Sequence, residues 1–107
     1  MSDEVQILRP QGRLDGESSP ELAQQALEMI DLGARRLLLD FRDLYYVSSA
    51  GLRAALAVAK RMSAVGGKVA ICSANPQVVE VFDIGGFVSV LELHASPESA
   101  TARLAEE

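Results

Sequence analysis

The run Arg36-Leu37-Leu38-Leu39-Asp40-Phe41 is apolar apart from Arg36 and Asp40, and it is the strongest indication of the fold class. Such a run is typical of a strand that is covered on both faces, as in a parallel sheet. A helical pattern follows over Ala50–Met62, and a second buried strand is predicted over Val69–Cys72. A strand, a helix and a strand in this order predict a right-handed crossover between parallel neighbours.

The same alternation extends outward in both directions from this unit. Ser19-Pro20-Glu21 is typical of a helix start, with Ser19 as the capping hydroxyl and a buried stripe of Leu22, Ala26, Leu27 and Ile30 before Gly33. We therefore expect one domain over residues 1–107, an α/β fold with a small mixed, largely parallel sheet of four to five strands and about four helices. The outer elements are expected as strands at Val5–Leu8 and Val88–Leu93, and as helices that begin at Asn75-Pro76 and Ser96-Pro97-Glu98.

Composition narrows the class of protein. The 107 residues carry ten basic and fifteen acidic side chains, a net charge of −5, and no basic stripe that would bind nucleic acid. The first residues are acidic where a secretory signal is basic, and charges interrupt every apolar run, so we expect no membrane insertion. The single cysteine, Cys72, suits a reducing compartment. The expected location is the cytoplasm.

Few residues are available for catalysis or metal binding. His94 is the single histidine, so a Cys/His zinc site cannot be assembled within one chain, and a Ser-His-Asp triad would depend on that one residue. Gly66-Gly67 and Gly85-Gly86 are not spaced as nucleotide-binding loops. We expect neither an enzyme nor a protein with a cofactor or metal.

In α/β domains the functional residues usually lie in the loops that lead from strands into helix N-termini. The segment Asp43–Leu52 is such a loop. Ser48 and Ser49 stand at the expected helix start, where a serine is a common N-cap. A serine in a first helical turn is also accessible to a kinase, and a phosphate there is favoured by free N–H groups and the helix dipole. Both interpretations hold together if Ser48 caps the helix and Ser49 accepts phosphate.

Four segments in register resemble the STAS domain family, specifically its single-domain anti-sigma factor antagonists. Gly12-Arg13-Leu14-Asp15 resembles the family's Gly-x-Leu-Asp turn, and Leu37–Leu44 its central strand and following loop. Val47–Leu52 resembles the signature Asp-Ser-Ser/Thr-Gly-Leu segment, and Phe82–Phe87 continues the match after Gly66-Gly67. The resemblance extends from about Val5 to Leu93 and implies a STAS-like fold.

The resemblance implies a protein that switches partners. In this family the unphosphorylated antagonist binds an anti-sigma factor that is also a serine kinase, and the sigma factor is released. Phosphorylation at the signature serine ends the complex, and a serine phosphatase resets it. Carried over by position, the acceptor is Ser49, and the partner-binding residues are Asp15, Ser48, Ser49, Ala50, Gly51 and Leu52. Asp15 is equally well explained as a turn carboxylate that accepts local backbone N–H groups.

Two features depart from the family pattern. Ser48 stands where the antagonists often carry aspartate, which makes Ser48 a second possible acceptor, and only four residues precede Val5 where relatives commonly have another short strand. The alternative function is a constitutive STAS docking subunit of a lipid-transport or chemosensory complex, without a phosphorylation switch.

Of Tyr45 and Tyr46, strand alternation predicts that one is buried and one exposed.

Overall fold

Strands and helices alternate along the chain in the computed structural model, which describes residues 4–84 and 91–106. Four helices are present among the described residues, as expected. The elements are β1 (Gln6–Leu8), β2 (Gly12–Leu14), α1 (Ser19–Asp31), β3 (Arg36–Asp40), β4 (Leu44–Val47), α2 (Ser49–Ala64), β5 (Lys68–Cys72), α3 (Pro76–Ile84), β6 (Glu92–His94) and α4 (Pro97–Ala105).

The main sheet has four strands in the order β1-β3-β5-β6, and all three of its pairings are parallel. This arrangement confirms the largely parallel α/β fold. The strand over Arg36–Asp40 is central, and it pairs with β5 from Arg36 opposite Lys68 to Asp40 opposite Cys72. The last strand was expected over 88–93, but it begins at Glu92, and residues 85–90 lie outside the described part of the chain.

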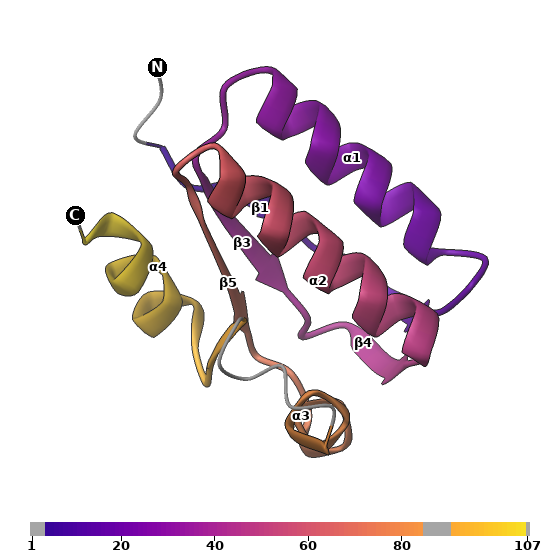
Figure 1. Ribbon diagram of the computed structural model, residues 1–107. Helices are drawn as coiled ribbons and strands as arrows, with labels where there is room; N and C mark the ends of the chain where they lie inside the picture. Colours follow the sequence, from indigo (N-terminus) through magenta and orange to yellow (C-terminus); the bar gives the residue numbers. More distant parts are fainter. Residues whose placement is uncertain (1–3, 85–90, 107) are drawn as a thin grey trace.

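Helices cover both faces of this sheet, as Figure 1 shows. The helices α1 and α2 lie side by side on one face, α4 lies on the other, and α3 stands beyond the end of β5 near β4. The side chains of β3 divide between two cores accordingly: Leu37 and Leu39 pack beneath α1 and α2, and Leu38 packs beneath α4. Because both faces of this strand are covered by helices, its side chains are apolar on both faces and do not alternate with polar ones. This explains the continuous apolar run.

The first helix begins differently from the expectation. Its N-cap is Ser18, in helical conformation and without a side-chain capping bond, and Ser19 is a buried helical residue. The prediction that Ser19 caps α1 is therefore wrong. Leu27, expected in the core, is 38% exposed, because the buried stripe follows Leu22, Ala26 and Ile30 and leaves Leu27 at its margin.

A second, two-stranded sheet was not foreseen. Its strands, β2 and β4, pair in parallel outside the main sheet, where the sequence had indicated a turn and a loop. Each strand is too short to show a clear period, and both contain exposed residues. This ribbon matters for function because β4 ends directly at the start of α2.

Candidate functional site

The two serines of the candidate site occupy different positions at the start of α2. Ser48 is the N-cap, with an extended backbone (φ −86°, ψ 175°), and its Oγ accepts a hydrogen bond from the Gly51 amide at 3.2 Å. The Ser48 amide in turn donates to the Leu14 carbonyl at 2.9 Å, which ties the helix start to the end of β2. The interpretation of Ser48 as the helix cap is confirmed.

Ser49 is the first residue of α2, and its side chain is exposed. Ser48, in contrast, is half-buried and caps the helix. The free amides of a first helical turn and the positive end of the helix dipole favour an anion at this place. The hydroxyl of Ser49 is therefore placed where an added phosphate is tolerated by the fold.

Gly51 lies beneath this surface, where α2 approaches β2 most closely. A Cβ at this position would be 2.4 Å from the Leu14 carbonyl oxygen and 3.0 Å from the Leu14 Cγ. Only glycine fits so close to another backbone. Leu52, at 8% exposure, belongs to the core, and Ala50 is half-buried at the surface. Of the six residues expected to bind a partner, Gly51 and Leu52 thus hold the helix against the ribbon and the core.

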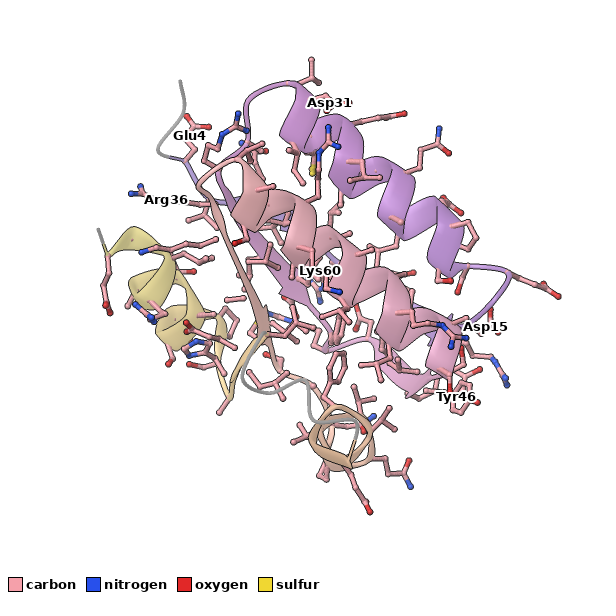
Figure 2. The ribbon with its side chains drawn as sticks, in the orientation of Figure 1. Glu4, Asp15, Asp31, Arg36, Tyr46 and Lys60 are labelled. Carbon is pink, nitrogen blue, oxygen red and sulfur yellow. The ribbon has the colours of Figure 1, made fainter. Side chains whose placement is uncertain are left out.

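Asp15 follows β2 and organises the turn into α1. Its Oδ1 accepts hydrogen bonds from the amides of Glu17 at 3.0 Å and Ser18 at 3.2 Å, and its Oδ2 is 3.3 Å from Nε of Arg13. The amides of Ser18 and Glu17, helped by Arg13, hold the pKa of this carboxyl below its usual value. The interpretation of Asp15 as a turn carboxylate is confirmed. Figure 2 shows Asp15 near Tyr46, at the end of the molecule where β4 leads into α2.

A family model for the STAS domain matches residues 1–100. The chain belongs to the STAS domain family. Within that family it is similar to the anti-sigma factor antagonists: it is 40% identical over 92 residues to BtrV of Bordetella bronchiseptica, a relative that carries this name. The match covers 86% of this chain and 79% of BtrV.

Solved structures show the same fold. The crystal structure of TM1081 from Thermotoga maritima, described as an anti-sigma factor antagonist, superposes with a TM-score of 0.90 at 20% identity, over 99% of this chain and 91% of that one. The Bacillus protein SpoIIAA has been solved unphosphorylated (TM-score 0.80, 24% identity, 95% and 89% coverage) and phosphorylated (0.73, 23%, 95% and 92%).

Serine in place of the usual aspartate before the signature serine is compatible with this STAS fold. Aspartate and serine are both strong N-caps, and the Ser48 hydroxyl makes the capping bond to the Gly51 amide. What the substitution removes is a negative charge next to Ser49. The helix start therefore keeps its geometry while the charge beside the candidate acceptor changes.

The sequence did not reveal that both tyrosines of β4 are exposed. Tyr45 is 60% and Tyr46 43% exposed, so the prediction that one is buried is wrong. The register between β2 and β4 shifts after Gly12: Gly12 lies opposite Leu44, whereas Arg13 lies opposite Tyr46. Tyr45 is the extra residue of this bulge, which breaks the alternation of the strand.

The single histidine of the sequence has structural partners. His94 lies at the end of β6, with Nδ1 2.9 Å from Ser99 Oγ and Nε2 3.2 Å from Glu92 Oε1, so it links the sheet edge to α4. Across residues 4–84 and 91–106, no three His, Cys, Asp or Glu side chains come together as a metal site. None of the helices described is both long and apolar enough to span a membrane.

Proposed function

We propose that the chain acts by partner switching, with Ser49 as the phosphorylated residue. In the unphosphorylated form it binds an anti-sigma factor that is also a serine kinase, and the sigma factor is released. Phosphorylation of Ser49 ends this complex, and a serine phosphatase resets the protein. In this account the chain is a cytoplasmic binding module that is itself no enzyme and needs no cofactor.

The observation that carries the proposal is the exposed Ser49 beside a separate capping serine. Phosphorylation of Ser49 leaves the bond from the Gly51 amide to Ser48 Oγ in place. The phosphate adds about −1.5 to −2 charges at pH 7, at a helix end that favours anions. The modified protein therefore stays folded, and the added charge acts on whatever binds this surface.

Ser48 is the weaker candidate for the acceptor. Its Oγ already accepts the capping bond at 3.2 Å, and the residue is half-buried. A phosphate on Ser48 would have to replace this cap, whereas a phosphate on Ser49 would not. The partner surface that follows from this geometry consists of Ser49 with its neighbours Ser48, Ala50 and Asp15.

The proposal is tested by binding of variants to the purified kinase that phosphorylates this chain. We expect Ser49→Ala to bind at least as well as the wild type and to stay bound in the presence of ATP. Ser49→Asp should bind at least about tenfold more weakly, because it places a charge in the interface. Ser63→Asp is the matched control, since Ser63 is an exposed serine near the other end of α2.

If Ser49→Asp binds the kinase as tightly as Ser63→Asp does, the charge at Ser49 does not control the complex and the switch is refuted. An assembly that holds the wild type equally well with and without ATP would indicate the constitutive docking subunit instead.

A further inference from the structure

The bulge in the β2–β4 ribbon gives this chain an aromatic surface directly before the signature segment. Tyr45 and Tyr46 are consecutive strand residues, yet both point to solvent, while Leu44 and Val47 on either side are buried. Bulges recur next to functional sites because they redirect a side chain. Tyrosine is enriched at the centres of protein interfaces, so two exposed tyrosines next to the signature segment indicate a docking surface.

Arg13 holds this surface in a defined geometry. Its guanidinium carbon lies 4.7 Å from the centroid of the Tyr46 ring, a cation–π contact. The same guanidinium is fixed by Asp15, whose Oδ2 is 3.3 Å from Arg13 Nε. Asp15 is itself held by the backbone amides of the turn into α1. The ring of Tyr46 is thus connected through Arg13 and Asp15 to a rigid turn.

We propose that Tyr45, Tyr46 and Arg13 form the anchor by which this chain docks the kinase that phosphorylates Ser49, and we call these three residues the aromatic anchor. The inference rests on the proposed function. The face that fits them is a protein surface with an apolar pocket for an aromatic ring.

The position of the aromatic anchor relative to Ser49 supports a shared partner. Tyr46 precedes Ser49 by three residues, a distance of about 10 Å at most along an extended chain. A standard interface covers about 800 Å² on each partner, which is much wider than this spacing. An interface centred on Ser49 is therefore wide enough to include Tyr46, and a ring already held by Arg13 loses little freedom on binding.

The test is the steady-state kinetics of Ser49 phosphorylation by the purified kinase and ATP, with this chain as the varied substrate. For Tyr46→Ala we expect KM for the chain to rise about 10- to 30-fold with kcat within about twofold, because docking is lost while Ser49 is unchanged. Tyr46→Phe keeps the ring and should retain KM within about threefold. Leu32→Ala is the control, since Leu32 is 89% exposed and lies at the far end of α1 from the ribbon.

The role of Arg13 is a positioning role and has its own readout. In the protein that keeps Tyr46, Arg13→Gln should raise KM for the chain about three- to tenfold. In the Tyr46→Ala variant the same substitution should have little further effect on KM. Independent, additive effects of the two substitutions would show that Arg13 does not act through the tyrosine ring.

The two proposals fail in different ways in this experiment. If Tyr45→Ala and Tyr46→Ala leave KM as Leu32→Ala does, Ser49 is still the acceptor and the aromatic anchor is refuted. If no kinase from the source cells transfers phosphate to Ser49 in the wild-type chain, the proposed function falls, and the aromatic anchor is overturned with it.

Discussion

Two helices of this STAS domain begin with a pair of serines, and the two pairs have opposite environments. At the start of α1, Ser18 is the N-cap in helical conformation and Ser19 is 5% exposed. At the start of α2, Ser48 is the N-cap in extended conformation and Ser49 is exposed. The second serine of the pair is thus buried at one helix start and exposed to solvent at the other, while the first is half-buried at both.

The difference comes from what caps each helix. Asp15 accepts the amides of Glu17 and Ser18 at the start of α1, and the Ser18 hydroxyl donates to the Arg13 carbonyl at 2.6 Å. At the start of α2, the capping bond comes from Ser48 itself. A capping serine with extended backbone places the next serine in the first turn and outside the core. Accessibility of a hydroxyl therefore follows from the cap and not from the serine pair.

The largest expected effect is at Gly51, which holds α2 against the ribbon. Gly51→Ala should lower the free energy of unfolding by about 3 kcal/mol, because the added Cβ meets the Leu14 carbonyl oxygen at 2.4 Å. Glu21, the third residue of α1 as Gly51 is of α2, is exposed, so Glu21→Ala should be within about 0.5 kcal/mol of the wild type. Urea denaturation measures both. Equal stability of the two variants would mean that α2 does not approach β2 as described.

A smaller effect is expected at the cap of α2. Ser48→Ala should cost about 1 kcal/mol, because the Gly51 amide loses its acceptor, whereas Ser48→Asp should keep most of that stability. Ser49→Ala is the matched control and should change stability by less than about 0.5 kcal/mol. If Ser49→Ala proves the more destabilising of the two alanine variants, the roles of the two serines are reversed.

The smallest effect separates the two helix starts by pH. Because the amides of Ser18 and Glu17 lower the pKa of Asp15, its ionised form stabilises the fold above the unfolded pKa of about 3.9, and this contribution is lost as the pH falls through the lower folded value. Amide hydrogen exchange should show the Glu17 and Ser18 amides at the entrance to α1 losing protection on acidification before the Gly51 amide of α2, whose acceptor is an uncharged hydroxyl. In Asp15→Asn this extra acid sensitivity of α1 should disappear. Identical acid profiles of the first turn in both proteins would contradict the assignment.

The elements that carry strong local signals could be predicted from the sequence. The run Leu37–Phe41 is buried on both faces as expected, and Ser96, followed by proline, caps α4 through the Ser99 amide at 3.1 Å. That one serine of the pair caps α2 likewise followed from its position at the expected helix start, whereas the choice of Ser49 as the acceptor came from the resemblance to the STAS family. These features depend on residues that are neighbours in sequence, so the sequence alone predicts them.

What the sequence could not show depends on contacts between distant segments. The ribbon pairs β2 with β4 across 30 residues, and its bulge turns both Tyr45 and Tyr46 outward against the alternation of a regular strand. Ser19 was expected to cap α1, but the Asp15 carboxylate, two and three residues away, accepts the amides of Glu17 and Ser18 in the turn before the helix. The bulge has no local signature, whereas the role of Asp15 as a turn carboxylate is local and was expected from the sequence.

Mass spectrometry of the protein from its native cells shows whether Ser49 is the phosphorylated switch residue. Trypsin releases residues 43–53 as one peptide that contains Ser48 and Ser49, and fragment ions distinguish the two. The account predicts one phosphate, on Ser49, that disappears on phosphatase treatment. A phosphate on Ser48 or Ser19, or none in any growth condition in which the protein is made, would contradict it.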